Sequence, residues 1–448
     1  MVGEGSHDFR EQLAGMLNIF QQHRHMPDEA RHSFIFPIPK QGAGGNTFEG
    51  ARQICLLEIL TKLVEGGITT AAMGIWEERN YLHPSAHGFR KGMSAGDLAA
   101  FVAAVGERYR KSGKPLYTLS ADITKAFQSV GLPAIEAALK RMGIPDDIIE
   151  LWMQVDRGEW LPPSSAGGLW DASFGTCQVI TSAGLSPSFR AQTGCRQGAR
   201  GSPFKFLVWI DMLWCWLEKE EVKGLAIIPG DANSLRILPL AFCDDIWAGC
   251  DDFAELQRIT HLIDAFLQCF DVELNPTKSM FVQIGVRSEC ELGLYRWLEG
   301  SQIWVPLPEI RDGASYRYLG IMLQPNGGWQ AMTATVMGKV RNWCAQVARA
   351  RLAVDQAALV LRSVVHGLLN YVLTAAPLSS TVMMRVDKLV AAALFRCAGL
   401  PRGRRTAWAF VDCEHGGLGM ISATTLRRMI VVESVLARLN AAAPHGIR

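Results

Sequence analysis

The chain has 448 residues, 49% of them apolar and 20% charged, and a formal net charge of +2. This balance excludes a disordered chain, and the length allows two or three globular domains. No run reaches the roughly 18 uninterrupted apolar residues that a membrane span needs, so we expect no contact with a membrane. The polar N-terminus is no secretory signal, and eleven cysteines without a C-x-x-C pair indicate reduced thiols. We therefore expect an intracellular protein, in the nucleus or the cytoplasm.

Charge is distributed unevenly along the chain. Residues 331–448 carry 15 Lys and Arg against 5 Asp and Glu, a balance of +10, whereas residues 1–330 carry 30 against 38, a balance of −8. An Arg-rich helical region could show this asymmetry by chance. The alternative, which an asymmetry of this size favours, is a basic lobe that faces a polyanion beside a lobe whose carboxylates hold metal.

The first third of the chain alternates helical and extended patterns. Residues 1–30 predict a helix, and residues 33–64 predict two short strands around a Gly-rich loop, followed by a helix. Residues 95–112 have helical periodicity, which ends at Gly113-Lys114-Pro115. The segment "LYTLSAD" then predicts a short strand that ends at Asp122.

The middle of the chain is mixed, and the end is helical. Residues 132–156 predict two helices around a break, residues 177–194 two strands, and residues 202–218 a buried helix. "RILPLAFCDDIWAGC" predicts a strand, a tight turn and a second strand, followed by a helix over 253–272. "YRYLGIMLQ" predicts one more strand, and the pattern after Trp329 is helical. This order indicates an α+β body followed by an all-α basic region.

Asp244 and Asp245 stand at the predicted hairpin tip inside an apolar run. Turn tips often carry Asp, so a structural explanation is available. A metal site needs a third carboxylate, and Asp122 is the best candidate because it ends a predicted strand that can pair with the hairpin. Three carboxylates at one sheet edge repel one another unless divalent cations neutralise them. Oxygen ligands on an open site suit Mg²⁺, and two such ions indicate nucleotidyl transfer.

Several short motifs follow in order along the chain: "FPIPK…ARQIC", "HGFRKG", "DITKAF", "GCRQGARGSP", "FCDD", "LNPTKS" and "YRYLG". Together they resemble the reverse transcriptases of non-LTR (LINE-like) retrotransposons, from about residue 34 to about residue 420. The resemblance implies an α+β right-hand polymerase, in which an antiparallel palm sheet packs on helices. It further implies an N-terminal helix and fingers at 1–113, a palm at 114–329 with part of the fingers interleaved, and an all-α thumb with a C-terminal extension at 330–448.

The palm motifs carry the catalytic residues that the resemblance implies. Asp122, Asp244 and Asp245 are implied as catalytic and metal-binding, with Asp122 and Asp244 the firm ligands and Asp245 supporting. Phe127 is implied to block a ribose 2′-hydroxyl, and Ile123 to contact the nucleotide. The implied cofactor is Mg²⁺, as two ions, with Mn²⁺ a possible substitute.

The other motifs are implied to contact substrates. Lys40 and Arg52 of the fingers hairpin and Lys278 are implied to approach the triphosphate, and Gln197 and Gly198 to bind the nucleotide. The remaining motif residues are Arg196, Ser202 and Pro203 in the nucleotide and template pocket, Tyr318, Leu319 and Gly320 in the primer grip, and Gly88, Phe89 and Arg90 in the "GFR" element. By themselves, Arg90 and Arg196 could equally be ion-paired.

We expect an RNA-directed DNA polymerase whose partners are an RNA template, a DNA or RNA primer and dNTPs. An RNA-dependent RNA polymerase is the nearest rival, and Phe127 argues against it. A domesticated, catalytically silent RNA-binding protein is the alternative from another class. The 448 residues contain no recognisable endonuclease motif, so we expect that function to lie elsewhere.

Overall fold

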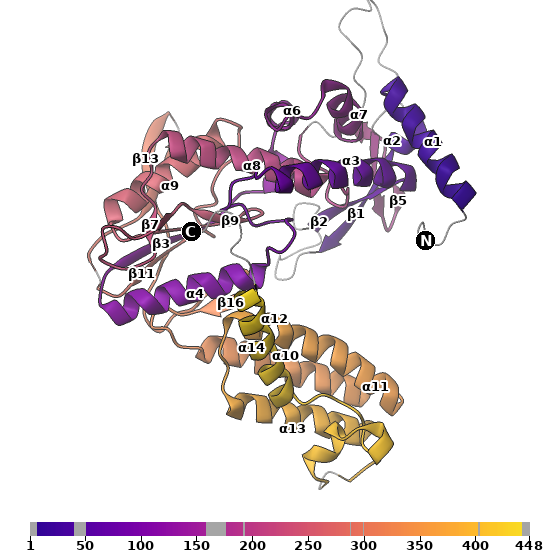
Figure 1. Ribbon diagram of the computed structural model, residues 1–448, viewed down its shortest axis with the longest axis vertical. Helices are drawn as coiled ribbons and strands as arrows, with labels where there is room; N and C mark the ends of the chain where they lie inside the picture. The colour runs from indigo at the N-terminus through magenta and orange to yellow at the C-terminus, as the bar shows by residue number, and fades with distance from the viewer. Residues whose placement is uncertain are drawn as a thin grey trace, which may run out of the picture.

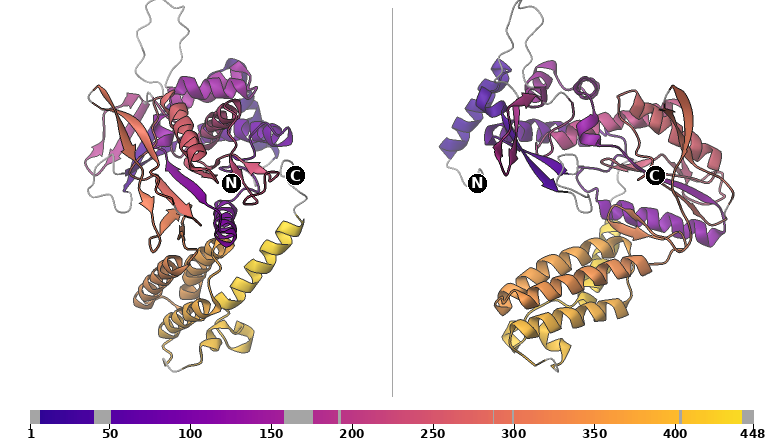
Figure 2. Two further views of the ribbon diagram at one scale, coloured as in Figure 1. Left: turned by 90° about the vertical axis from the view of Figure 1, so that its left-hand side faces the viewer. Right: turned by 180° about the vertical axis from the view of Figure 1, so that it is seen from behind.

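The protein is described by a computed structural model over residues 7–39, 51–157, 176–190, 193–286, 288–298, 300–401 and 404–440. A sheet-bearing body occupies the N-terminal two thirds, and a bundle of helices forms a separate layer beneath it (Figures 1 and 2). This arrangement is the α+β body with an all-α region that the sequence predicts. We use fingers, palm and thumb for the parts defined below.

The fingers are built on a five-stranded sheet in the order β2-β1-β4-β5, with β6 paired to β4. Strands β1 and β2 pair in antiparallel register from Ser33↔Leu57 to Pro39↔Ala51, so the predicted hairpin is confirmed on both sides of its tip. The elements are α1 (His7–His23), α2 (Asp28–Arg31), β1 (Ser33–Pro39), β2 (Ala51–Leu57), α3 (Ile59–Glu78), β4 (Thr176–Thr181), β5 (Gly184–Leu185) and β6 (Phe189–Arg190).

A buried ion network ties the fingers to the palm. The Lys205 ammonium lies 2.6 Å from an Asp156 carboxylate oxygen and 3.2 Å from a Glu65 carboxylate oxygen, and all three side chains are fully buried. Each comes from a different helix: Glu65 from α3, Asp156 from α7 (Asp146–Arg157) and Lys205 from α8 (Ser202–Lys219). Glu65 also accepts a hydrogen bond from the Gly201 amide at 3.3 Å. The network therefore fixes the loop before α8 relative to the fingers.

The palm sheet has the order β14-β11-β3-β10-β9, and only the β14–β11 pair is parallel. Both of its faces are covered. Alternate residues of β3 and β10, such as Leu119 and Ile246, pack on the helices of one face, whereas Leu116 and Trp247 pack with α4 and the thumb. The strands are β3 (Leu116–Asp122), β9 (Leu240–Phe242), β10 (Asp245–Cys250), β11 (Met280–Ile284) and β14 (Glu309–Ile310).

Further helices and hairpins complete the palm. The predicted strand over 316–324 is wrong in one respect, because the segment is a hairpin of two three-residue strands, β15 and β16. The elements are α4 (Ala95–Ser112), α5 (Ala126–Ser129), α6 (Leu132–Arg141), α9 (Phe253–Gln268), β7 (Leu225–Ala226), β8 (Arg236–Ile237), β12 (Gly293–Leu298), β13 (Ser301–Pro306), β15 (Tyr316–Tyr318) and β16 (Ile321–Leu323).

Every regular element in the described part of the thumb is helical, as the sequence predicts. Its elements are α10 (Gln330–Arg349), α11 (Val354–Leu361), the π-helical turn η2 (Arg362–His366), α12 (Gly367–Ala375), α13 (Ser380–Cys397), the 3₁₀ turns η3 (Thr406–Phe410) and η4 (Cys413–His415), and α14 (Ala423–Asn440).

One helical stretch of the described chain, Val354–Ala375, is long and apolar enough to cross a membrane by length and composition. Core helices meet the same criterion, and Leu361, Val365 and Leu369 of this stretch are buried against other thumb helices. The expectation of no membrane contact stays a prediction.

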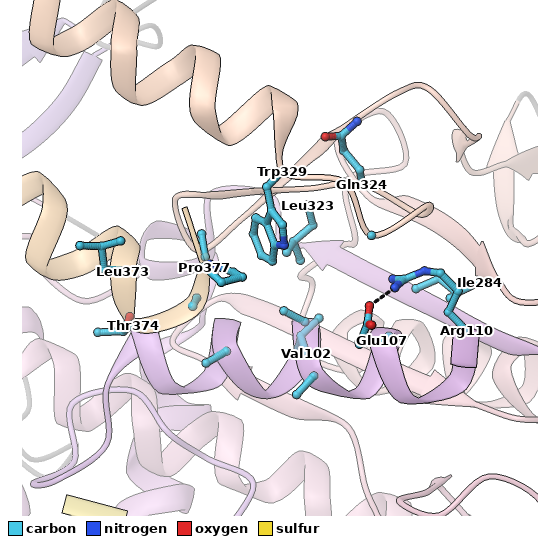
Figure 3. Close-up of a pocket in the computed structure, with 18 of the residues that line it drawn as sticks. Val102, Glu107, Arg110, Ile284, Leu323, Gln324, Trp329, Leu373, Thr374 and Pro377 are labelled. Carbon is cyan, nitrogen blue, oxygen red and sulfur yellow. Dashed lines mark hydrogen bonds and ion pairs between the residues drawn. The ribbon is translucent and has the colours of Figure 1, made fainter. Parts of the chain in front are cut away.

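Helix α4 forms the joint between palm and thumb, and it lies between the two parts in Figure 1. The Arg110 guanidinium donates to the Pro325 carbonyl at 3.3 Å and so holds the loop that leads into α10. A cavity of about 590 Å³ opens beside this contact, with Val102 of α4 on one side and Trp329 and Pro377 on the other (Figure 3). The implied fingers range 1–113 includes α4, which in the structure packs on β11 and α12. The domain boundaries themselves stay predictions.

Candidate active site

The palm carboxylates meet through strand register. Strand β10 pairs with β3 so that Asp245 lies directly opposite Asp122, and the same register continues to Cys250↔Tyr117. Residues that face each other across an antiparallel pair project from the same side of the sheet. Asp122 and Asp245 therefore share the face that carries Trp247 and looks toward α4 and the thumb. A slip of one residue would place the two carboxylates on opposite faces.

Asp244 stands in the two-residue turn that joins β9 to β10. Phe242 pairs with Asp245, so Cys243 and Asp244 alone form the turn, and Cys243 has a φ of +59°. Gly88 packs on this turn so closely that a Cβ atom there would lie 2.5 Å from the Cys243 amide nitrogen. The glycine of the "GFR" element is thus required because the turn occupies the space of any side chain.

The "LNPTKS" segment is attached to the strand end that carries Asp122. The Asn275 amide donates to the Asp122 carbonyl at 2.8 Å, and the Asp122 amide donates to the Ser279 hydroxyl at 3.1 Å. These two bonds bring Lys278 over the site, where its ammonium lies 3.7 Å from an Asp122 carboxylate oxygen. Lys278 is mostly exposed, so its side chain remains accessible to an anionic substrate.

Burial and neighbouring carboxylates raise the pKa of both hairpin aspartates. Burial raises the pKa of Asp244, and the Asp122 carboxylate adds to the rise while Lys278 opposes it. Burial likewise raises the pKa of Asp245 to about 6, with Asp244 and Asp122 adding and Arg317 opposing. Desolvation and like charge together destabilise the ionised forms. A bound cation would relieve both effects.

The donor set fits a hard divalent cation held in an open site. No group of three or more His, Cys, Asp or Glu side chains is arranged as a metal cage in the described ranges. The palm supplies instead the facing pair Asp122 and Asp245, with Asp244 at the turn beside them. Hard cations bound by few carboxylates complete their shells with water and substrate oxygens. The arrangement therefore matches an ion that arrives with its substrate.

Phe127 is held by two other aromatic rings. Its ring stacks on Phe206 of α8 with centroids 4.5 Å apart, and the Phe89 ring meets it edge-on at 6.3 Å. The Phe127 carbonyl accepts from the Cys195 amide at 2.7 Å. Packing on two sides and this backbone bond give the half-buried ring a fixed position, as a steric gate requires.

The "RQG" loop lies along the edge of the fingers hairpin. The Cys55 amide donates to the Gln197 carbonyl at 2.6 Å, and a Cβ atom on Gly198 would lie 2.5 Å from the Cys55 carbonyl oxygen. Gly198 also has a φ of +111°, so both space and backbone favour glycine. The Gln197 side-chain oxygen is buried and finds no hydrogen-bond partner in the described chain, which makes it a candidate contact for a ligand.

Two motif arginines are structural. Arg196 is only 4% exposed and donates to the Ser33 hydroxyl at 2.9 Å, so the expectation that it lines the substrate pocket is wrong. Arg90 makes two 2.8 Å contacts with the Glu77 carboxylate and also donates to the carbonyls of the loop before it. The ion-paired interpretation, left open by the sequence, holds for Arg90.

The remaining predicted residues divide into three groups. Lys40 lies outside the described residues, and Arg52 is exposed on β2 with no described contact to the carboxylates. Ile123 is 3% exposed within the palm core, so a nucleotide contact there is limited to its main chain. The primer-grip residues Tyr318, Leu319 and Gly320 occupy the end and turn of the β15–β16 hairpin.

Sequence reasoning missed residues that hold the site together. Asn275 and Ser279 fix Asp122 from a segment about 155 positions away, and Glu77 fixes the "GFR" loop through Arg90. The first two lie inside a recognised motif and could have been found there. No sequence signal marks Glu77.

The profile of the family "Reverse transcriptase (RNA-dependent DNA polymerase)" matches residues 38–323, well over half of the chain. The chain belongs to the reverse transcriptase family. Among curated proteins it is 24% identical over 433 residues to a "Retrovirus-related Pol polyprotein from type-1 retrotransposable element R2" of Popillia japonica, covering 95% of this chain and 55% of that protein. It is 23% identical over 344 residues to the Pol polyprotein of the type-2 element R2DM of Drosophila melanogaster, covering 76% of this chain and 30% of that protein.

The chain thus spans about half the length of the first of these relatives and less of the second. Its solved structural neighbours include apo telomerase from Candida tropicalis, at 12% identity and a TM-score of 0.49, covering 98% of this chain and 72% of that chain. Another is telomerase from Candida albicans in complex with a fragment of telomeric RNA, at 11% identity and a TM-score of 0.45, covering 91% and 60%.

The family match and the R2 relatives confirm the recognition of a non-LTR reverse transcriptase, and the family match together with the sheets and helices described above confirms the fold class. They say nothing about individual residues, so the roles of Asp122, Asp244, Asp245, Phe127 and Lys278 in this reverse transcriptase stay predictions that the geometry described above supports.

We predict that Asp245→Asn stabilises this reverse transcriptase when no divalent cation is present. The pKa of Asp245 is raised in the fold, so ionising this carboxyl group destabilises the folded state. The free energy of unfolding therefore falls as the pH rises from about 4 through about 6. At pH 7.5 in EDTA the variant should gain about 1 to 2 kcal/mol in the free energy of unfolding, measured by urea titration.

Below about pH 3 the two proteins should have nearly the same stability, because Asp245 is then largely neutral in the folded and the unfolded state. Asp251→Asn is the matched control. Asp251 directly follows β10 at the end away from the site, and its carboxylate pairs with Arg236 at 3.4 Å. A gain in the free energy of unfolding that is as large at about pH 3 as at pH 7.5 would contradict the claim that the charge on Asp245 destabilises the fold.

Proposed function

We propose that this reverse transcriptase extends a primer along an RNA template by nucleotidyl transfer, as the RNA-directed DNA polymerase of a non-LTR element. The observation that supports this most is the register that puts Asp122 opposite Asp245, with Asp244 at the adjoining turn. The family gives the reaction class, and the carboxylate arrangement is what that reaction requires.

The catalytic residues have distinct roles in this proposal. Asp122 and Asp244 would hold Mg²⁺, as two ions for which Mn²⁺ can substitute, and Asp245 orients the hairpin beside them. When bound, such ions supply charge neutralisation for the attacking primer hydroxyl and the leaving pyrophosphate. Lys278 pairs with Asp122 in the absence of substrate and is free to turn to a triphosphate, to which Lys40 and Arg52 are proposed as further donors.

Sugar selection supports DNA synthesis over RNA synthesis. The Phe127 ring is fixed between Phe206 and Phe89, so it is unable to move aside for an added hydroxyl without breaking two ring contacts. An RNA polymerase must leave that space open. We therefore propose dNTPs as the substrates, with Gln197 and Gly198 lining the nucleotide site.

The thumb is proposed to hold the template–primer duplex. Its charge balance of +10 over residues 331–448 suits phosphate contacts, which supply most of the affinity of nonspecific nucleic-acid binding. An RNA template and a DNA or RNA primer follow from the family. We propose an intracellular location, and the nucleus in particular, because elements of this family copy themselves at chromosomal targets.

We predict that Asp244→Asn abolishes primer extension. A DNA primer annealed to an RNA template is incubated with Mg²⁺ and dNTPs, and the product is read on a denaturing gel. Loss of one metal-binding charge should lower the extension rate by at least about 10³-fold, whereas salt-sensitive duplex binding should stay within about twofold.

The control is Asp251→Asn, which should extend like the wild type. Normal extension by Asp244→Asn would refute the metal assignment. A wild-type protein that binds the duplex tightly but never extends it would instead support the silent RNA-binding alternative.

We predict that Phe127→Ala lets ribonucleotides enter. Removing the ring opens the space for a 2′-hydroxyl, so the preference for dNTP over rNTP, as a ratio of kcat/KM values, should fall by about 10- to 100-fold. Phe127→Tyr keeps the bulk and should keep the preference. An unchanged ratio in Phe127→Ala would remove the gate role from this residue.

A further inference from the structure

The turn of the primer-grip hairpin is strained. Strands β15 and β16 are joined by Leu319 and Gly320 alone, with φ values of +45° and +83°. Two-residue hairpin turns of this kind favour Asn, Asp or Gly at both positions, because a larger side chain clashes with its own backbone. A leucine at the first position costs free energy, of the kind that persists only where the surroundings hold the turn in place.

A thumb side chain supplies that hold. The Tyr371 hydroxyl of α12 donates a hydrogen bond to the Leu319 carbonyl. The Tyr371 ring also covers Gly320, since a Cβ atom on that glycine would lie 3.3 Å from the ring edge. One thumb residue thus contacts both residues of the turn.

The π-helical turn before α12 sets the direction of Tyr371. A π turn adds one residue to an α-helix and so rotates the following residues by about 100° around the axis. The η2 turn is fixed within the thumb, because the His366 ring meets the Ile421 carbonyl at 3.0 Å and Arg362 donates to the Gly419 carbonyl at 3.1 Å. The extra residue therefore determines which face of α12 meets the palm.

Helix α12 is also docked on the palm helix α4. Gly96 lies so near α12 that a Cβ atom there would be 2.5 Å from the Thr374 hydroxyl, and that hydroxyl donates to the Tyr371 carbonyl at 2.7 Å. Beside this contact the joint is hollow, at the cavity lined by Val102 and Trp329 (Figure 3). The palm–thumb joint thus combines a shared apolar cluster with close polar contacts, of which that of Tyr371 is one.

The strand leading into the turn shares a buried apolar cluster with Leu240 and Trp247 of the catalytic hairpin. Tyr318 is 1% exposed, and its hydroxyl finds no hydrogen-bond partner in the described ranges. Burial raises the pKa of Tyr318 well above its usual value, and the Asp245 carboxylate adds to the rise. A shift of the hairpin would therefore be transmitted to the site that carries Asp245.

We propose that Tyr371 is a positioning residue that couples the thumb to the primer grip by holding the strained Leu319–Gly320 turn beside the catalytic carboxylates. The docked thumb then presents the primer terminus in register, and an undocked thumb leaves the turn free to relax. The inference rests on the proposed polymerase function for its effect on extension, but the contact itself is independent of catalysis.

The test compares Tyr371→Phe with Tyr109→Phe. Tyr109 is a matched control, because its hydroxyl also donates to a backbone carbonyl, that of Ala226, at 2.7 Å, away from the primer grip. In Tyr371→Phe the single-turnover extension rate of prebound duplex should fall by about three- to tenfold, with duplex affinity and the KM for dNTP unchanged. Tyr109→Phe should retain the wild-type rate.

A rescue separates positioning from a general loss of stability. Asn adopts a positive φ more readily than Leu, so in a Leu319→Asn background the turn needs less support, and Tyr371→Phe should then lower the rate by less than twofold. An equal penalty in both backgrounds would overturn the proposal. So would wild-type extension by Tyr371→Phe.

A second readout does not depend on activity. Amide hydrogen exchange across residues 316–323 should accelerate by several-fold in Tyr371→Phe and stay unchanged in Tyr109→Phe. Unchanged exchange in Tyr371→Phe would refute the claim that Tyr371 stabilises the turn, even if the protein extends no primer. A wild-type protein that extends nothing, with the exchange difference present, would refute the polymerase function and leave the contact standing.

Discussion

The arrangement of this protein depends on one strand register, the antiparallel pairing that puts Asp245 opposite Asp122. The pairing brings two like charges together in a largely buried place, which raises the pKa of Asp245 to about 6, mainly through burial. Surrounding structure holds them there. Palm helices cover the opposite face of the sheet, the Asn275 segment fixes the end of β3, and the loop at Gly88 covers the turn. A site assembled against its own repulsion is prepared for cations that arrive with an anionic substrate.

Division of charge between lobes is the second organising feature. The part that carries the carboxylates is net acidic, whereas residues 331–448 have a balance of +10. The joint between the two parts combines an apolar cluster that the palm and the thumb share with polar contacts: Arg110 on one loop, and Tyr371 on the primer-grip turn. Duplex contacts on the thumb and chemistry on the palm are thus linked through this packed joint.

Much of the site could be predicted from the sequence because its residues are close to turn and strand signals. Asp244 and Asp245 interrupt an apolar run at a turn, and Asp122 ends a strand, so their convergence follows from pairing two short strands. The order of the motifs then gave the family and the α+β fold. Phe127 was predicted from its spacing to Asp122, and its two aromatic neighbours explain how it is held.

The sequence failed where burial or long-range contact decides a residue's role. Arg196 sits in a recognised motif, but its type says nothing of whether it faces substrate or the Ser33 hydroxyl. The β15–β16 hairpin was predicted as one strand because Leu319 is not a turn residue, and its turn conformation is held by Tyr371, 52 positions away. The buried network of Lys205, Glu65 and Asp156 likewise joins three helices that no local pattern connects.

Binding of Mn²⁺ to the wild type and to Asp122→Asn, followed by electron paramagnetic resonance, tests the central claim most directly. Asp122 is chosen because it holds one side of the paired strands. With template–primer duplex and a nonhydrolysable dNTP present, we expect the wild type to take up two ions and Asp122→Asn to lose at least one, with a fall in affinity of about 10- to 100-fold for the remainder. Equal stoichiometry and affinity in the two proteins would contradict the account, because the facing carboxylates would then not be the metal site.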